Sequence, residues 1–161
     1  MNIYHDISEF HGRNTVTTIG IFDGIHIGHQ LIFKRLIELG SLYKNETVVI
    51  TLWPHPRTVL QPFEKLWLLT TLEEKIEMIK RYSVDHLIIL PFTREFSETT
   101  YEDFIRTYLY EKIRASHVVV GYNHHFGKNR QGSFESLLKS SSVYGFSAER
   151  MNPVVVNNTE V

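Results

Sequence analysis

Short runs of apolar, largely β-branched residues recur along the chain and alternate with segments of helical periodicity. The runs cover residues 15–22, 47–53, 86–92, 118–122 and, more weakly, 153–156. Each run is apolar on both faces and is bounded by turn residues, a pattern typical of buried strands in a parallel sheet. The sequence therefore predicts about five strands.

The segments between these runs have the spacing of amphipathic helices. A helix is expected over residues 28–40, with Gly40 as its C-cap, and a shorter one over 133–140. Capping-box sequences predict helices over residues 71–82 and 99–113. Because parallel strands need crossover connections, this alternation predicts an α/β fold. We expect a single domain with a Rossmann-like, doubly wound parallel sheet; another α/β layer fold is the alternative.

Composition narrows the class of protein. The 161 residues are 42% hydrophobic and 22% charged, with a net charge of -1, so there is no basic field that would attract nucleic acid. Cysteine is absent, which excludes disulfides and thiolate metal sites. No apolar stretch approaches the ~20 residues that cross a bilayer, and the N-terminus lacks the pattern of a signal peptide. We therefore expect a cytoplasmic protein with neither a membrane nor a nucleic-acid partner.

The segment GIFDGIHIGHQ, residues 20–30, links the first expected strand to the first expected helix. In a doubly wound sheet, this turn presents backbone N–H groups and the positive end of a helix to phosphate groups. His26 and His29 are three residues apart, which places both imidazoles on one side of the turn. Neutral N–H donors at that place could stabilise the charge that builds on phosphoryl oxygens.

Two other interpretations of this histidine pair stay open. The histidines could be ordinary surface residues, or they could bind a metal ion, although no third ligand is obvious nearby. The strand–turn–helix context favours phosphate binding. Gly20 and Gly24 lack β-carbons, which would let a nucleotide approach the backbone closely.

Two further loops follow expected strands. After the second strand, the sequence WPHPR at 53–57 contains two prolines that fix the backbone; a plain turn with a solvated His55 is the alternative. After the fourth strand, residues 121–132 combine glycines, an aromatic residue and cations, as ligand-binding loops do. Asn123 could pair with the donor–acceptor edge of an isoalloxazine ring, and Phe126 could contact its face. All three loops are expected at the carboxyl edge of the sheet, where ligands bind.

These motifs resemble those of a known family. His-Ile-Gly-His resembles the HIGH motif of the nucleotidyltransferase superfamily, and the longer string at 20–30 resembles its form in bacterial FAD synthetases, the bifunctional riboflavin kinase/FMN adenylyltransferases. The string TLWPHP resembles that family's Thr-Phe-x-Pro-His-Pro motif, with Leu52 in place of the aromatic residue. Residues 121–132 resemble its Gly-x-Asn/Asp-Phe-x-Phe-Gly-Lys-x-Arg-x-Gly motif, with His124 in place of a phenylalanine.

The resemblance implies an FMN adenylyltransferase that transfers AMP from ATP to FMN and gives FAD and pyrophosphate. It implies that His26 and His29 are catalytic and that Mg²⁺ is held mainly by the ATP phosphates, without a metal site of protein ligands alone. The implied ATP site comprises Gly20, Phe22, Asp23, Gly24, His26 and His29. The implied FMN site comprises Pro54, His55, Pro56, Asn123 and Phe126.

The resemblance also implies that a segment is missing. The family carries an Ile-Ser-Ser-Thr-x-Ile-Arg motif just after the fifth strand, and this chain ends where that motif should begin. The riboflavin kinase domain that normally follows is absent too. We therefore expect residues 1–161 to be an adenylyltransferase domain shortened at its C-terminal end. A flavin- or nucleotide-binding fragment without efficient turnover and a sister nucleotidyltransferase with another phosphate acceptor are the alternatives.

Overall fold

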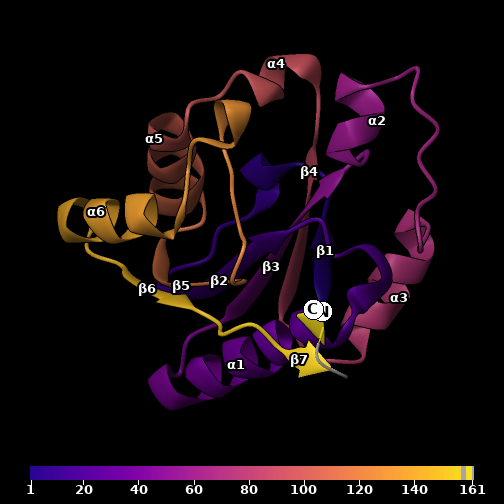
Figure 1. The fold of residues 1–161 in the computed structure, drawn as a ribbon. Coiled ribbons are helices and arrows are strands. Elements are labelled where there is room, and N and C mark those ends of the chain that lie inside the picture. The colour runs from indigo at the N-terminus through magenta and orange to yellow at the C-terminus, as the bar shows by residue number, and fades with distance from the viewer. Residues whose placement is uncertain (157–158, 161) are drawn as a thin grey trace.

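A computed structural model describes residues 1–156 and 159–160 of the chain. At its centre lies a parallel sheet of six strands in the order β1-β4-β3-β2-β5-β6 (Figure 1). The strands are β1 (Asn2–Tyr4), β2 (Thr15–Gly20), β3 (Thr47–Trp53), β4 (His86–Pro91), β5 (Ala115–Val120) and β6 (Ser147–Arg150). The pairings confirm the predicted doubly wound, Rossmann-like sheet.

Helices connect successive strands and cover both faces of the sheet. The longer ones are α1 (Ile27–Tyr43), α3 (Leu72–Lys80), the π-helix η3 (Phe104–Lys112) and α6 (Phe134–Tyr144). The shorter ones are α2 (Pro56–Leu60), α4 (Arg94–Ser97), α5 (Tyr101–Asp103) and the turns η1 (Ile7–Glu9), η2 (Asp23–Ile25) and η4 (Lys128–Arg130). In the described part of the chain, none of these helices has the length and hydropathy needed to cross a bilayer.

The core consists of two apolar layers, one on each face of the sheet. Val48 and Ile50 of β3 pack in the layer formed with η3 and α6, whereas Val49 packs in the layer formed with α1 and α3. Figure 1 shows α1 and α3 on the side of the sheet away from α5 and α6. Because alternate strand residues point to opposite faces, both layers require apolar residues. This explains the continuous apolar runs in the sequence.

The edges of the sheet differ from the expectation. The predicted strand at 153–156 is wrong as a sheet strand, because Val155–Val156 form β7, which pairs antiparallel with β8 (Thr159–Glu160) outside the main sheet. The outer strand is instead β6, whose polar sequence SAER carries no buried run. The other edge strand, β1, has three residues, which are too few to show a hydrophobic periodicity. Edge strands bury less apolar surface, so their sequence signal is weak.

Three helix boundaries test the capping predictions. The capping box at Thr71 is present, and it opens α3 as predicted. The next helix begins one residue later than predicted, because Thr100 is the N-cap and accepts a hydrogen bond from the Asp103 N–H. Helix α1 continues past Gly40 and ends at Lys44, which adopts a left-handed conformation with φ of 56°. Gly40 therefore lies inside the helix, and its prediction as a C-cap is wrong.

The chain reverses its winding direction at β2. Strands β3 and β4 follow on one side of β2, and strands β5 and β6 follow on the other. Ligands of open α/β sheets bind outside the carboxyl ends of the strands at this kind of switch point. The turn at 21–26 after β2 and the loop at 121–132 after β5 both start there.

Candidate active site

The chain leaves β2 in a strained turn. Phe22 has φ of 53° and Ile25 has φ of 40°, and left-handed conformations are costly for residues other than glycine, above all for a β-branched one. Both side chains are buried, and the Phe22 ring packs 5.0 Å from the Phe33 ring between centroids. Packing against the core therefore helps to hold the turn in this conformation.

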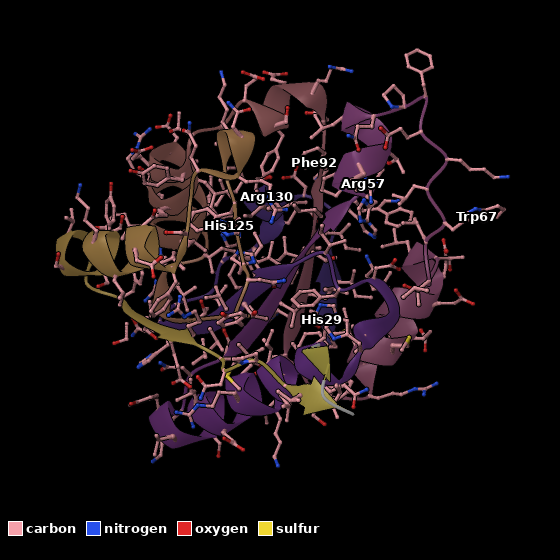
Figure 2. The ribbon with its side chains drawn as sticks, in the orientation of Figure 1. His29, Arg57, Trp67, Phe92, His125 and Arg130 are labelled. Carbon is pink, nitrogen blue, oxygen red and sulfur yellow. The ribbon has the colours of Figure 1, made fainter. Side chains whose placement is uncertain are left out.

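This turn brings His26 and His29 together at the start of α1. Their ring centroids are 3.7 Å apart with an interplanar angle of 29°, so the rings stack on one side of the turn, as their spacing predicts. His29, labelled in Figure 2, meets the Phe22 ring edge-on at 5.1 Å. Its Nδ1 atom is buried and has no hydrogen-bond partner among the described residues. His29 therefore keeps a hydrogen-bonding capacity that no described residue uses.

The surroundings of both histidines disfavour the charged imidazole. Burial lowers the pKa of His29 to about 4, and the nearby His26 and Lys75 add to this effect. Burial also lowers the pKa of His26. The sequence predicts neutral imidazoles from the helix N-terminus, whereas the structure gives burial as the main cause. A neutral imidazole can donate an N–H to a phosphoryl oxygen.

Asp23 ties the turn to the segment that precedes α3. Its carboxylate accepts hydrogen bonds from the Leu69 N–H at 3.0 Å, the Thr70 N–H at 3.0 Å and the Thr70 hydroxyl at 3.1 Å. Burial opposes ionisation of Asp23, but these hydrogen bonds outweigh it and hold the pKa of the carboxyl below its ordinary value. The Asp23 oxygens are thus already engaged by the protein. Asp23 acts as a brace for the turn.

Two glycines of the turn have structural reasons, a left-handed backbone at Gly24 and close packing on Phe22 at Gly20. Gly24 has φ of 70°, and a β-carbon there would lie 2.7 Å from the Leu69 side chain. A β-carbon on Gly20 would lie 2.8 Å from the Phe22 ring. These contacts explain why both positions are glycine in the protein itself. The sequence predicts a further reason, the close approach of a nucleotide to the backbone.

Lys75 of α3 is a member of this site that the sequence analysis missed. Its side chain is only 2% exposed, and its Nζ donates a hydrogen bond to the Ile21 carbonyl oxygen at 2.6 Å. The Nζ also lies 5.3 Å from the centre of the Trp53 ring. The signal that could have revealed it is its spacing: Lys75 falls on the same helix face as Leu72 and Ile79.

The Pro-His-Pro segment starts helix α2. Pro56 is the first helical residue, where a missing N–H costs nothing, and His55 is the N-cap. The His55 Nδ1 accepts a hydrogen bond from the Arg57 N–H at 3.1 Å. Burial lowers the pKa of His55; the charge of Asp23 raises it, and the charge of Lys75 lowers it further. His55 is thus within the electrostatic influence of Asp23 and Lys75, and Pro54 and Pro56 flank it in the chain.

The loop after β5 holds its two predicted flavin contacts in different settings. Asn123 is exposed in a turn. Phe126 is 8% exposed and packs 5.6 Å from the Phe104 ring between centroids, and its backbone pairs with Gly132. The Phe126 ring is thus part of the core, and His124 stacks on it at 5.7 Å. Of the predicted pair, only Asn123 presents its side chain to solvent.

The structure therefore brings the predicted residues into two groups. The histidine turn, Lys75 and His55 form one group, and Asn123 with Phe126 lies across the switch point in the other loop. Among the described residues, no hydrogen bond joins the two groups.

Figure 2 shows that Trp67, on the long connection between α2 and α3, points away from the centre of the molecule.

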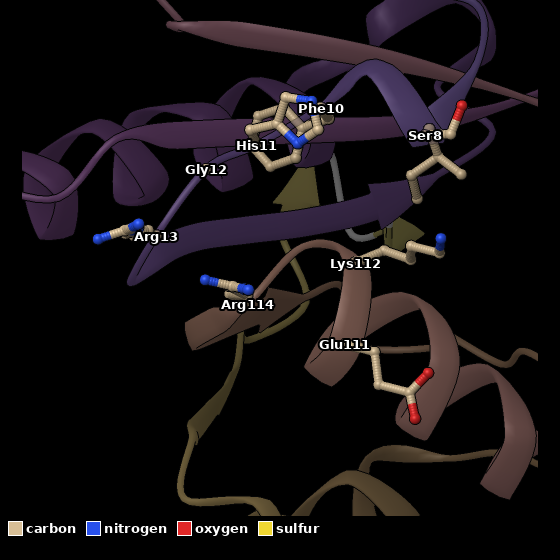
Figure 3. Close-up of a pocket in the computed structure, with 9 residues that line it drawn as sticks. Ser8, Phe10, His11, Gly12, Arg13, Glu111, Lys112 and Arg114 are labelled. Atoms are coloured by element: carbon tan, nitrogen blue, oxygen red, sulfur yellow. The ribbon is translucent and has the colours of Figure 1, made fainter.

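Two hollows lie near these elements. One of about 310 Å³ lies beside the histidine turn, between Trp53 and residues 68–74. The other, about 390 Å³, lies at the amino ends of β2 and β5 and is lined by Arg13, Lys112 and Arg114 among others (Figure 3). It contains none of the predicted site residues, because those lie at the carboxyl ends of the strands.

Known proteins resemble this chain over most of its length. A family described as FAD synthetase matches residues 9–161. A bifunctional riboflavin kinase/FMN adenylyltransferase of Buchnera aphidicola is 33% identical over 157 residues, which cover 98% of this chain and 50% of that protein. An FAD synthetase of Listeria monocytogenes is 34% identical over 151 residues, which cover 92% of this chain and 60% of that protein. The chain thus spans about half the length of the bifunctional relative.

A solved structure supports the fold. A Streptococcus pneumoniae chain described as a macrolide-efflux protein superimposes with a TM-score of 0.85 and 23% identity, covering 99% of this chain and 52% of that one. At this identity the likeness speaks for the fold alone. The family match across residues 9–161, together with the relatives' identity, shows that the chain belongs to the FAD synthetase family.

Proposed function

We propose that this chain is an FMN adenylyltransferase domain, which transfers AMP from ATP to FMN and releases pyrophosphate. The observation that carries the proposal is the stacked His26–His29 pair at the start of α1, in a chain that belongs to the FAD synthetase family. This pair lies at the switch point of the sheet, where a nucleotide is expected.

The proposed reaction is an in-line displacement at phosphorus. An oxygen of the FMN phosphate forms a bond to the α-phosphorus of ATP, while the bond from that phosphorus to the bridging oxygen of the pyrophosphate breaks. A phosphate monoester is already ionised near neutral pH, so the attacking group needs no strong base. Catalysis then depends on alignment and on stabilisation of the phosphoryl charge.

His26 and His29 are the proposed catalytic residues. Each neutral ring has an N–H that can donate to a phosphoryl oxygen, and the N-terminus of α1 adds its partial positive charge. The ring of His29 is fixed by Phe22 and by His26, so little reorganisation is needed during the reaction. The other residues of the proposed ATP site shape it through the backbone of the turn and not through free polar side chains. They are Gly20, Phe22, Asp23 and Gly24.

Mg²⁺ enters the proposal as part of the MgATP substrate. The acidic residue of the turn, Asp23, uses its carboxylate on Leu69 and Thr70. Within the described residues, no cluster of three or more acidic or histidine side chains could hold a metal ion. Mg²⁺ commonly keeps phosphate and water ligands, which suits this site.

FMN is proposed to bind across the switch point. Asn123 has a free amide that can pair with the donor–acceptor edge of the isoalloxazine ring. Pro54, His55 and Pro56 form the other wall, and Phe126 supports the loop from the core. A cytoplasmic location fits the cysteine-free composition and stays a prediction.

The direct test mixes the chain with FMN and MgATP and measures FAD and pyrophosphate by chromatography. We expect FAD with the wild-type chain and a loss of product with His29→Ala. FMN binding without product would favour the alternative of a binding fragment that lacks efficient turnover. Absence of both product and FMN binding would contradict the proposal and favour a sister nucleotidyltransferase.

A further inference from the structure

The buried Lys75 side chain lies beneath the histidine turn without a direct ion-pair partner among the described residues. Within the described residues, no acidic side chain forms an ion pair with Lys75, and the hydrogen-bond acceptor of its Nζ is the Ile21 carbonyl oxygen at 2.6 Å. Its side chain is 2% exposed. Burying a charge is costly unless it is paired, and an ammonium has three N–H donors. Burial lowers the pKa of Lys75 and the attraction of Asp23 opposes that shift, so an anionic ligand close to the turn would further favour its charged form.

Lys75 also restrains the strained backbone of the turn. The Ile21 carbonyl oxygen accepts a second hydrogen bond, from the Thr51 hydroxyl at 3.1 Å. Ile21 directly precedes Phe22, the first left-handed residue of the turn. Strained conformations persist where the surrounding structure over-determines them, and bonds from α3 and β3 do so here.

The charge of Lys75 shifts the pKa values of several groups in the first residue group. It contributes to the pKa values of His29, His55 and Asp23, which come from the turn, the Pro-His-Pro segment and the brace. The Nζ atom bonds to the Ile21 carbonyl after β2 and lies 5.3 Å from the centre of the Trp53 ring at the end of β3. The Lys75 head group therefore lies between the loops that follow these two strands.

We propose that Lys75 is a positioning residue of the phosphate-binding part of the nucleotide site. It fixes the histidine turn through the Ile21 carbonyl, and its charge compensates the phosphates of ATP and the pyrophosphate product. The proposal rests on the proposed function, because it requires a polyphosphate ligand at this turn. It gives the buried charge a second anionic neighbour beside Asp23, which attracts Lys75 without forming an ion pair with it.

The test compares Lys75→Met with Lys80→Met, a control on the same helix whose lysine is exposed and paired with Glu77. Calorimetry measures the binding of pyrophosphate, adenosine and FMN separately, after thermal unfolding shows that each variant is folded. We expect Lys75→Met to weaken pyrophosphate binding by about 10-fold or more, because the variant loses both the hydrogen bond that fixes the turn and the charge that attracts the phosphates. Adenosine and FMN affinities should stay within about twofold, because they carry no polyphosphate. Equal losses for all three ligands, or no loss for pyrophosphate, would overturn the proposal.

A rescue experiment separates charge from packing. Because the chain has no cysteine, Lys75→Cys provides a single thiol. Alkylation of the unfolded chain with 2-bromoethylamine and refolding restores an ammonium at nearly the original length, whereas iodoacetamide gives a neutral side chain. The charged adduct should bind pyrophosphate at least about 10-fold more tightly than the neutral one. Equal affinities, or a neutral adduct that fails to fold while the charged one folds, would make Lys75 a structural residue and overturn the proposal.

The same measurements distinguish this inference from the proposed function. If the wild-type chain binds pyrophosphate and forms FAD while the Lys75 variants behave alike, the inference fails and the proposed function stands. If the wild-type chain binds neither pyrophosphate nor FMN, the proposed function fails, and the inference fails with it.

Discussion

The two loops at the switch point are built in opposite ways. The turn at 20–26 buries Phe22 and Ile25, and it is braced by hydrogen bonds to Asp23 and from Lys75. The loop at 121–132 exposes Asn123 and is attached to the protein through the buried Phe126, which pairs with Gly132, and through the Lys128 N–H, which donates to the Thr99 carbonyl oxygen at 2.7 Å. The turn buries its left-handed residues other than glycine, whereas the left-handed Asn129 and Arg130 of the loop are exposed.

This difference matches the separate roles that we propose for the two loops. Displacement at phosphorus requires donors held in place, because misalignment raises the barrier directly. Recognition of the phosphate acceptor requires exposed polar groups, which a loop on a rigid base can supply. The comparison therefore predicts separable effects: changes in the turn should alter catalysis, and changes in the loop should alter flavin affinity.

The largest expected effect comes from His29→Ala. Losing an oriented donor to the phosphoryl charge should lower the rate of FAD formation by roughly 10²- to 10³-fold. FMN affinity, measured by calorimetry, should stay within about twofold, because the acceptor loop is untouched. His11→Ala, at an exposed histidine far from the turn, is the control and should leave both values unchanged. A matching loss of rate and FMN affinity would contradict the separation.

Asn123→Ala tests the other loop and should have a smaller effect. Removing its amide should weaken FMN binding by about 10-fold, the cost of one or two hydrogen bonds, while MgATP binding survives. Calorimetry with each ligand measures both values, and Gln131→Ala, an exposed amide in the same loop, is the matched control. Weaker ATP binding with unchanged FMN binding would reverse the assignment of the loops.

Asp23→Asn tests the brace through its pH dependence. The pKa of Asp23 in the folded protein is below its ordinary value, so the ionised carboxylate stabilises the fold above that ordinary value. The variant should lose roughly 1 kcal/mol of unfolding free energy at pH 7, since the group is partly exposed. That loss should shrink as the pH falls through the folded-state pKa. Denaturant unfolding at pH 7 and pH 3 measures it, and a pH-independent difference would argue against the carboxylate as the brace.

The smallest expected effect concerns the pKa of His29 in the unsubstituted protein. With a pKa of about 4, its imidazole should stay under roughly a tenth protonated at pH 5.5, where an ordinary histidine is mostly charged. Imidazole NMR shifts of the free protein between pH 7.5 and 4 measure this value. A midpoint near 6.5 would mean that the turn is open to solvent and less fixed than we describe.

The sequence predicts the parts of this molecule that local patterns determine. Strands β2 to β5 are apolar on both faces, so their runs were visible, and the stacking of His26 on His29 follows from three-residue spacing. Lys75 was missed because its role depends on the Ile21 carbonyl, 54 positions away in the chain. The burial of Phe126 depends likewise on the distant Phe104. Contacts between segments far apart in the sequence leave no periodic signal.

The most direct test of the two-loop account maps each ligand onto the backbone. Amide NMR shifts would be followed during titration with the magnesium complex of α,β-methylene-ATP, which cannot transfer AMP, and separately with FMN. The account predicts that the nucleotide shifts residues 20–29 and 70–75, whereas FMN shifts 53–57 and 121–126. Shifts from both ligands in a single loop, or shifts confined to the hollow around Arg13 and Arg114, would contradict it.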